Sequence, residues 1–519
     1  MKGFRIINLS LTNHPILGTN EFKFYDGDDN DDNSPYFTII IGPNGTGKSE
    51  ILKCLLLIWR DFYQYFIDEE SQYKPLQFFY TLEYTLNGKV YKYSNGLTNK
   101  FIALTISGKS HLRGQLFDKN SKIVSISDEE YYSYYPLQIV AQSIMMTDKF
   151  FVQRNENEKI RFAPYHYLGI RSTRQQTSTG FYVRRTVDLI IKAINNKYFK
   201  KGISNLIDFI GATGSFIIQY KTKNHKLFYT GNLTAEILDD YFKEIEKNYE
   251  GKIAPFKLAD YNKLKKNVLE LLKSVEFVNK LVNEDNLDKI DRSSAKALNF
   301  DLRNNKQMEF LERHQYDIDR LRKLGLLSPP TIKFSDKDVE LQNASSGEFH
   351  LFTTMIGLMA STRNDSLVII DEPEISLHPN WQMKYLQFIR ELFADTDRVT
   401  SHIIIATHSH FLVSDLPGEN STIIGLKKED GEIESLPITK NTFGWSAEEV
   451  LLEIFQVPTT RNHFISEKIG EILDEIANPN KNVDLIKSYV QELLEKNIDE
   501  LSNEDPLKEI VDKLVEKYG

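Results

Sequence analysis

The spacing of hydrophobic and polar residues changes several times along the chain. Near the start, short apolar runs predict strands over residues 4–9, 21–25 and 36–41, and apolar residues at three-to-four spacing predict a helix over 48–66. A glycine-rich segment separates the third strand from this helix. The pattern therefore predicts a unit of strand, tight loop and helix.

From residue 76 to about 127 the pattern changes to short alternating runs, which are typical of strands with one exposed face. Asn-Gly pairs at 87–88 and 95–96 interrupt these runs. Asn-Gly is the pair that tight hairpin turns favour, because both residues accept a positive φ. We therefore expect an antiparallel β subdomain here, followed by a short strand over 137–141.

The middle of the chain is predicted to be mostly helical. Apolar stripes at helical spacing cover residues 187–194, 235–249, 262–282 and 307–324, and a hairpin is expected over 215–229. Strands return at 367–370 and 403–406 with helices between them, and the chain is helical again after about 441. The expected regions are 1–182, 183–329, 330–440 and 441–519, and the expected fold class is α/β.

Composition limits the class of protein. The chain has 519 residues, 41% hydrophobic and 26% charged, which suits a soluble globular protein of two or three compact units. Its longest apolar runs fall short of the ~20 residues that a membrane span needs, and the N-terminus has no apolar signal-peptide region. The single cysteine, Cys54, lies among apolar residues, so we expect a core position and no intramolecular disulfide. A cytoplasmic protein without a membrane partner is expected.

Charge is unevenly distributed along the chain. The net charge is −9, and residues 441–519 hold 17 acidic against 8 basic residues, so the tail carries the acidic excess. Conversely, the basic segment from Lys149 to Lys201 holds 12 Lys and Arg residues and three acidic ones. A nucleic acid would bind there, although nucleotide contacts and solvated helix faces would produce the same composition.

The glycine-rich segment has the composition of a phosphate-binding loop. Its residues are Gly42, Pro43, Asn44, Gly45, Thr46, Gly47, Lys48 and Ser49. Glycines let backbone N–H groups converge on phosphates, and the following helix presents its positive end to the same anion. Lys48 is placed to reach the β- and γ-phosphates of ATP, and Ser49 to coordinate Mg²⁺.

Two carboxylates end a predicted buried strand. Residues 367–370 are all apolar, and Asp371 and Glu372 follow at the carboxyl end, where α/β proteins hold ligands. Asp371 there can hold Mg²⁺, directly or through water. Glu372 is placed to accept a proton from the attacking water, as a general base must.

Two polar residues follow other strands. His408 comes after the strand at 403–406 and would lie near the γ-phosphate as a polar sensor, although alone it would be an ordinary strand-end histidine. The nearby His402 and His410 are expected at the surface. Gln142 follows the strand at 137–141 and would couple the metal and the water to the helical region, but a hydrogen-bonded loop glutamine is a nearly equal alternative.

A small polar turn opens the predicted helix over residues 349–359. Its residues are Ala344, Ser345, Ser346, Gly347 and Glu348. Taken alone this turn would be only a helix cap. With the first loop already covering its own phosphates, we expect a two-fold pairing in which Ser345 and Gly347 of one chain cap the γ-phosphate held by the other.

Together these motifs resemble those of the ABC ATPase superfamily, in its SMC, RecF and OLD branch. The run Asp-Glu-Pro-Glu-Ile-Ser-Leu-His-Pro, from Asp371 to Pro379, is particularly similar to OLD-type and defence-associated ATPases, in which a histidine, here His378, replaces the usual aspartate. The resemblance covers about residues 1–180 and 330–440. It implies an ABC-type P-loop head with an antiparallel β subdomain, a helical insert and a helical C-terminal tail.

The same resemblance implies ATP and Mg²⁺ as ligands and a site shared between two chains. One protomer would supply Lys48, Ser49, Gln142, Asp371, Glu372 and His408, and its partner Ser345, Gly347 and Glu348. The chain departs from the branch in two ways. No Toprim-like acidic cluster follows residue 441, so no intrinsic nuclease is expected, and the insert lacks the long heptads of a coiled-coil arm.

A short arm with a compact helical tail resembles the ATPase subunits of bacterial antiphage systems, such as PtuA of Septu and the PARIS ATPase. This resemblance implies an ATP-hydrolysing homodimer, or a larger assembly, that holds or restrains a separate effector nuclease, of the HNH type in Septu. The alternative is a RecF-like DNA-repair ATPase that binds DNA directly through the basic segment.

Overall fold

The structure is a computed structural model in which two compact units, Met1–Gly444 and Trp445–Gly519, are described separately. With isolated positions between them, the described residues are 3–27, 35–66, 75–96, 103–106, 109–112, 134–152, 164–171, 179–221, 297–323, 326–336, 339–394, 399–414, 420–429, 431–438, 444–453, 463–479, 481–496 and 505–519.

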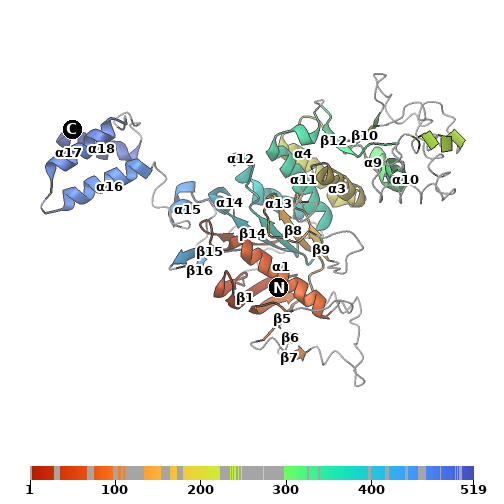
Figure 1. Ribbon diagram of the computed structural model, residues 1–519, viewed down its shortest axis with the longest axis horizontal. Coiled ribbons are helices and arrows are strands. Elements are labelled where there is room, and N and C mark those ends of the chain that lie inside the picture. The colour runs from red at the N-terminus through yellow and green to blue at the C-terminus, as the bar shows by residue number, and fades with distance from the viewer. Residues whose placement is uncertain are drawn as a thin grey trace. The chain divides into compact units, whose positions relative to one another are not determined.

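A seven-stranded sheet forms the centre of the first unit (Figure 1). Its strands, in order, are β16 (Glu432–Ile438), β15 (Ser421–Glu429), β3 (Tyr36–Ile41), β14 (His402–Thr407), β13 (Leu367–Asp371), β8 (Ile139–Ser143) and β9 (Tyr165–Tyr167). Only β16 runs antiparallel to its neighbour. Strands β3, β14, β13 and β8 are buried along their whole length, which explains their mostly apolar sequences. The register aligns Asp371 with Ala406 and Ser143, so the carboxyl ends of these strands lie at one edge.

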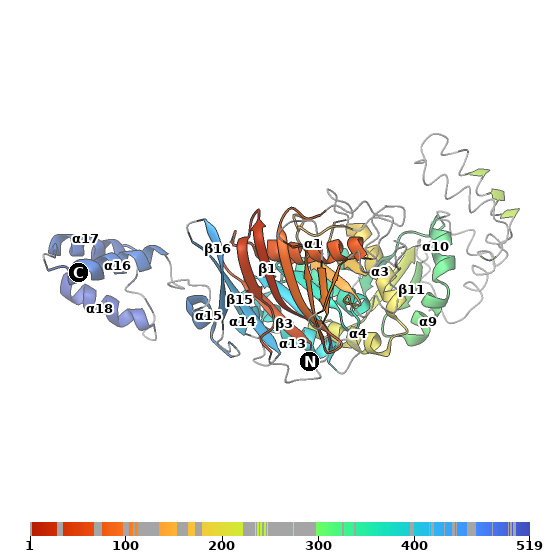
Figure 2. The same ribbon diagram turned by 90° about the horizontal axis from the view of Figure 1, so that it is seen from below.

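A second, antiparallel sheet confirms the predicted β subdomain. Its order is β2 (Gly18–Lys23), β1 (Arg5–His14), β4 (Phe79–Leu86), β5 (Lys89–Ser94), β6 (Ala103–Ile106) and β7 (Lys109–Leu112). Helix α1 (Lys48–Phe66) shares one core with both sheets (Figure 2). The fully buried ring of Trp59 contacts Phe4 and Tyr84, with ring centroids 5.7 and 5.0 Å away. Cys54 is buried in the same core, as expected.

One of the two predicted Asn-Gly turns is present. Asn87 and Gly88, with φ of 51° and 74°, join β4 to β5 in a two-residue hairpin. The prediction is wrong for Asn95-Gly96, because the side chain of Asn95 is buried and used elsewhere. Its amide accepts from the backbone N–H of Tyr80 and donates to the carbonyl of Phe78.

The arm, residues 179–334, combines helices with a small antiparallel sheet. Its described elements are α3 (Thr179–Ala193), α4 (Lys197–Ile210), β10 (Phe216–Lys221), β11 (Ala297–Asp301), α9 (Asn305–Arg313), α10 (Gln315–Lys323) and β12 (Thr331–Phe334). The helices predicted at 235–249 and 262–282 lie almost wholly outside the described residues.

Two predictions for the arm need correction. The expected hairpin over 215–229 is wrong, because β10 has the distant strands β11 and β12 on its two edges. The helix expected over 307–324 is divided into α9 and α10, since His314 leaves the helical conformation between them. Helices α3 and α4 pack on α11 (Ser346–Ser361) of the head. The arm is therefore joined to the helix that the Ser345 turn begins.

The second unit is helical, as predicted. It contains α15 (Ala447–Glu453), α16 (His463–Ala477), α17 (Val483–Leu494) and α18 (Pro506–Tyr518). The last three helices enclose their own apolar core, which includes the fully buried Ile472 and Ile486. Within the part of the chain that the structure describes, no helix is long and apolar enough to cross a membrane.

Candidate nucleotide site

The phosphate-binding loop connects β3 to α1, as predicted, and its glycines are required by the backbone. Gly42 has a φ of +153°, and a Cβ atom there would lie 2.5 Å from the carbonyl oxygen of Leu426. Gly47 has a φ of +88°, and its Cβ would lie 2.6 Å from the side chain of Leu17. The loop therefore cannot accept larger residues at these two positions without moving β15 or the β1–β2 turn.

Lys48 is folded back over the loop. Its ammonium donates to the carbonyls of Gly42 at 2.8 Å and Pro43 at 3.1 Å, and to Nδ1 of His408 at 3.3 Å. Burial lowers the pKa of Lys48 to about 8, although the carboxylates of Glu372 and Asp371 act in the opposite direction. A cation held this way is positioned for an anion above the loop.

Ser49 and Asp371 place two oxygen ligands side by side. The hydroxyl of Ser49 donates to Oδ1 of Asp371 at 3.0 Å, and Asp371 is fully buried at the end of β13. Its Oδ2 accepts no hydrogen bond from any residue that the structure describes. Burial raises the pKa of Asp371 to about 7. Adjacent hydroxyl and carboxylate oxygens with a free coordination position are the donor set that suits Mg²⁺.

Glu372 adopts a strained backbone conformation. Its φ is +49°, a region that non-glycine residues occupy rarely and often at functional sites. The backbone N–H of Glu372 donates to Ala406 at 2.9 Å, so the residue bridges the ends of β13 and β14. Its Oε1 lies 3.1 Å from Nε2 of His408. This hydrogen bond lowers the pKa of Glu372, which keeps the carboxylate ionised.

Glu374 belongs to the site but has no role in the sequence prediction. Its Oε1 accepts the backbone N–H of His408 at 2.6 Å, which ties the loop after β13 to the end of β14. The only signal in the sequence was its position two residues after Glu372 in the Asp-Glu-Pro-Glu run. Burial raises the pKa of Glu374, whereas the pKa of the neighbouring Glu372 is lowered.

Gln142 lies in β8, not after it as expected, and is in register with Ile370, one residue before Asp371. It is 2% exposed, and its Oε1 accepts no hydrogen bond from the described residues. A buried amide oxygen without a donor costs free energy. The role of Gln142 in coupling stays a prediction.

The Ser345 turn is capped by its own residues, with Ser345 and Ser346 exposed and Gly347 buried. Ser345 is the N-cap of α11, and its hydroxyl accepts from the N–H of Glu348 at 3.2 Å while Glu348 accepts from the N–H of Ser345 at 3.0 Å. Gly347 packs so closely on the loop after β13 that a Cβ atom would lie 2.7 Å from the carbonyl oxygen of Ser376. Among the described residues, no hydrogen bond or ion pair joins this turn to the phosphate-binding loop.

His402 is not at the surface as expected. It is fully buried at the start of β14, where Nδ1 accepts the N–H of Ile6 at 3.0 Å and Nε2 lies 2.8 Å from Oγ1 of Thr38. Its ring therefore links Ile6 in β1 of the antiparallel sheet to Thr38 in β3 of the seven-stranded sheet. His410 is partly buried, so the surface prediction is wrong for His402 only.

The described part of the basic segment uses several of its charges internally. Lys149 pairs with Glu50 at 2.9 Å, Nε of Arg171 donates to buried Asp148 at 2.9 Å, and Arg185 donates to two backbone carbonyls. Arg154, Lys159, Arg161 and Arg174 lie outside the described residues. Nucleic-acid binding by this segment stays a prediction.

The structure thus brings Lys48, Ser49, Asp371, Glu372 and His408 together at one strand edge. A model of the AAA ATPase domain family matches residues 28–413, which is well over half of the chain. The chain belongs to this family. The chain also has the α/β head with an antiparallel β subdomain that the resemblance to ABC-type ATPases implied.

Two curated proteins are similar to this AAA ATPase. The "Retron Vc95 probable ATPase" of Vibrio cholerae serotype O1 biovar El Tor is 22% identical over 479 residues, which cover 86% of this chain and 78% of the relative. The "Septu protein PtuA" of Bacillus thuringiensis is 29% identical over 92 residues, 17% of this chain and 22% of the relative. The chain is therefore an ABC-like ATPase related to defence ATPases.

Two solved structures are weakly similar. The SMC head domain from Thermotoga maritima matches with a TM-score of 0.35 and 13% identity, over 84% of this chain and 99% of that one. The recombination mediator RecF bound to ATP matches with a TM-score of 0.28 and 13% identity, over 84% of this chain and 98% of that one.

Proposed function

We propose that this ATPase hydrolyses ATP at a site that two copies of the chain complete together. The observation that carries the proposal is the Ser345 turn, an exposed helix N-terminus with its own cap and without a bond to the phosphate-binding loop of the same chain. The phosphate-binding loop and the strand edge of one chain already provide the ammonium of Lys48, the oxygens of Ser49 and Asp371, and the carboxylate of Glu372. A second anion site on the same fold then requires a ligand held by another copy.

Within one protomer, each residue has a distinct part. Lys48 moves from the loop carbonyls to the β- and γ-phosphates of ATP, and Ser49 and Asp371 hold Mg²⁺. The bound Mg²⁺ neutralises charge that develops on the phosphates. Glu372 accepts a proton from the attacking water, while His408 fixes the direction of its carboxylate and contacts the γ-phosphate. Gln142 in β8 would offer its amide oxygen to the metal or to its water.

The partner's Ser345 turn would then supply hydrogen bonds to the γ-phosphate. Ser345, Ser346 and Gly347 contribute a hydroxyl and backbone N–H groups, and Glu348 keeps the turn in shape through its bonds to Ser345. ATP binding therefore favours the dimer, and hydrolysis releases it. The dimer is the smallest assembly that this arrangement allows, and a larger one would use further surfaces.

We further propose that the ATPase is a subunit of an antiphage defence system of the Septu type, in which it holds or restrains a separate nuclease. The similarity to the Retron Vc95 probable ATPase along 86% of the chain and to Septu protein PtuA supports the proposal. The helical unit Trp445–Gly519 has its own core and carries the acidic excess of the chain. We therefore propose it as the surface that binds a basic partner.

Co-expression with a nuclease, where one is encoded beside this chain, tests the proposal. The full chain should retain the nuclease during purification, and a chain ending at Gly444 should lose it while still binding ATP. Equal retention by both chains would contradict the assignment of the dock. Salt-sensitive DNA binding by the full chain, with no nuclease encoded nearby, would instead favour the DNA-repair alternative.

A further inference from the structure

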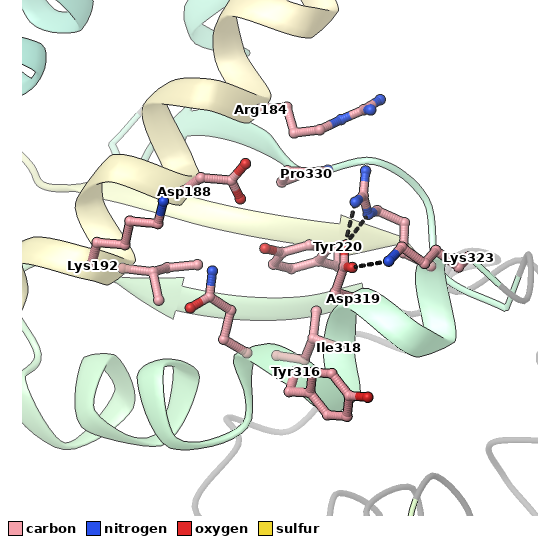
Figure 3. A pocket seen from close by; sticks show the side chains of 12 residues that line it. Arg184, Asp188, Lys192, Tyr220, Tyr316, Ile318, Asp319, Lys323 and Pro330 are labelled. Carbon is pink, nitrogen blue, oxygen red and sulfur yellow. Dashed lines mark hydrogen bonds and ion pairs between the residues drawn. The ribbon is translucent and has the colours of Figure 1, made fainter. Parts of the chain in front are cut away.

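A second cavity lies in the arm and is separate from the nucleotide site. Its volume is about 610 Å³, within the range of small-molecule sites. Helix α3 forms one wall with Arg184, Asp188 and Lys192 at the spacing of a single helix face, and α10 forms the opposite wall (Figure 3). The buried ring of Tyr220 from β10 lines the cavity between them. We call this cavity the arm pocket.

The arm pocket has an excess of positive charge. Its charged lining consists of Arg184, Lys192, Arg322, Lys323, Asp188 and Asp319, four cations against two carboxylates. Asp319 is already neutralised, because Arg322 and Lys323 both bind it at 3.1 Å. The other wall therefore presents two cations and a single carboxylate to the cavity, and Figure 3 shows all three side chains along α3.

Arg184 is the residue that most needs a partner. Its buried Nε makes no hydrogen bond to any residue that the structure describes. Arg184 on α3 and Arg322 on α10 line opposite walls of the cavity. Burial, and after it the guanidinium of Arg322, lower the pKa of Arg184, although the carboxylates of Asp188 and Asp319 act in the opposite direction. An anion between the two guanidinium groups would relieve this repulsion, and phosphate has the geometry that paired guanidinium N–H groups bind well.

The rest of the lining is suited to an organic group. Ile191, Ile318 and Pro330 are apolar, and Tyr316 beside them is 63% exposed, with the guanidinium of Arg320 5.2 Å from the centre of its ring. A water molecule occupies about 30 Å³, and a phosphate ion is only a few times larger. The cavity of about 610 Å³ therefore has room for a larger organic group beside a phosphate. Nucleobases stack on exposed aromatic rings with a useful gain in affinity.

We propose that the arm pocket binds a phosphorylated nucleoside, with Arg184 and Arg322 holding the phosphate and Tyr316 packing against the base. The ligand is either a free nucleotide or the 5′-terminal nucleotide of a nucleic acid, which share this chemistry. The site is independent of the ATP site, because none of its lining residues belongs to the phosphate-binding loop or the strand edge.

Calorimetry on the full-length Lys48→Ala chain tests the proposal, since this variant disables the ATP site. The probes are AMP, inorganic phosphate, tetrathymidylate with a 5′-phosphate and the same oligonucleotide with a 5′-hydroxyl. Binding of AMP alone identifies a free nucleotide, and binding of the 5′-phosphorylated oligonucleotide identifies a terminus. The proposal would be overturned if neither AMP nor the 5′-phosphorylated oligonucleotide bound. It would also be overturned if both oligonucleotides bound with the same affinity. Inorganic phosphate binding as tightly as AMP would also overturn it.

Matched variants locate the binding in the pocket. Arg184→Gln should weaken binding about tenfold or more, because a hydrogen bond to a charged group is lost. Asp188→Asn should tighten it, since a carboxylate beside the anion is removed. Arg313→Gln, an exposed arginine on α9 outside the pocket, should leave affinity unchanged. Equal affinity in Arg184→Gln and Arg313→Gln would overturn the assignment.

Two further variants separate the halves of the ligand and guard against misfolding. Tyr316→Ala should weaken AMP and leave the weak affinity for inorganic phosphate unchanged, whereas Tyr316→Phe should bind AMP as the parent does. Among the residues that the structure describes, none forms an ion pair with Arg184, so Arg184→Gln should keep the thermal unfolding profile of the parent. Arg322→Gln removes one of the two cations that bind Asp319, so it could also disturb the fold. It therefore serves only as a second test of the phosphate contact.

Discussion

The imidazole of His408 is held between the carboxylate of Glu372 and the ammonium of Lys48. Nε2 lies 3.1 Å from Glu372 and Nδ1 lies 3.3 Å from Lys48. Because an ammonium only donates, Nδ1 accepts and Nε2 carries the proton that Glu372 accepts. Both groups that would face the terminal phosphate are therefore oriented by one histidine. When Lys48 turns to the phosphates, the contact to Nδ1 is released and the Glu372 contact can remain.

Glu372→Gln should abolish turnover while preserving ATP binding, because an amide cannot accept the proton of the attacking water. We expect a fall in kcat of about 100-fold or more, the scale of general-base catalysis. The variant should also accumulate as a dimer with ATP, measured by phosphate release and by light scattering after size exclusion. Lys48→Ala is the matched control that should lose nucleotide binding itself. Wild-type turnover in Glu372→Gln would show that another group is the base.

A mixed dimer tests whether the Ser345 turn acts on the partner's nucleotide. Ser345→Arg and Lys48→Ala should each be inactive alone, since one blocks the turn and the other the loop. In a mixed dimer one of the two composite sites is intact, so an equal mixture should recover about a quarter of the wild-type ATPase rate. Ser345→Arg also removes a helix cap worth about 1 kcal/mol, so its thermal unfolding is measured in parallel. No recovery on mixing would place both elements in one chain's site.

The parts of the site that were predictable are those that local chemistry determines. The phosphate-binding loop needs its glycines for backbone geometry, and a buried strand followed by Asp371 and Glu372 has few alternatives in an α/β sheet. The burial of His402 could not be predicted, because it depends on Ile6 and Thr38, residues brought beside it only by the assembled sheets. The outcome for Asn95 was also non-local, since its amide serves a neighbouring strand instead of a turn.

The arm was harder to predict for a related physical reason. Strand β10 pairs with β11 and β12, and a strand's sequence indicates that it needs neighbours without indicating which ones. Alternation and a turn signal therefore suggested a local hairpin. The basic segment shows the same limit, because charge density in sequence does not distinguish Arg171, bound to Asp148, from Arg184, which faces a cavity.

Arg171→Met should destabilise the head, because it leaves the fully buried carboxylate of Asp148 without its cation. Among the described residues, Asp148 would keep the hydroxyl of Tyr167 at 2.7 Å and the N–H of Phe150 at 2.9 Å. We expect a loss of about 3 kcal/mol in the free energy of unfolding, measured with urea. Lys149→Met removes a cation from the same segment, but the side chain of Lys149 is 43% exposed and its buried partner Glu50 keeps Lys53 at 2.8 Å. Its effect should therefore stay below about 1 kcal/mol. Equal effects would contradict a structural role specific to Arg171.

His402 should make the stability of the protein depend on pH below neutrality. Burial, and after it the charge of Arg5, hold the pKa of His402 well below the 6.5 of an exposed histidine. Above pH 6.5 the residue is neutral in both the folded and unfolded states, and its full contribution is present. As the pH falls below 6.5 toward the folded pKa, the unfolded state binds the proton first, so stability is lost by up to about 1.4 kcal/mol per pH unit. Protonation of Nδ1 would also break the bond from Ile6.

Urea unfolding from pH 8 to pH 5 measures this effect. His402→Gln can accept from Ile6 and donate to Thr38 but cannot titrate, so we expect lower stability at pH 8 and a shallower fall toward pH 5 than in the wild type. The same slope in His402→Gln as in the wild type would mean that other groups bind the proton. In that case His402 would contribute packing and hydrogen bonds between the sheets without linking the fold to pH.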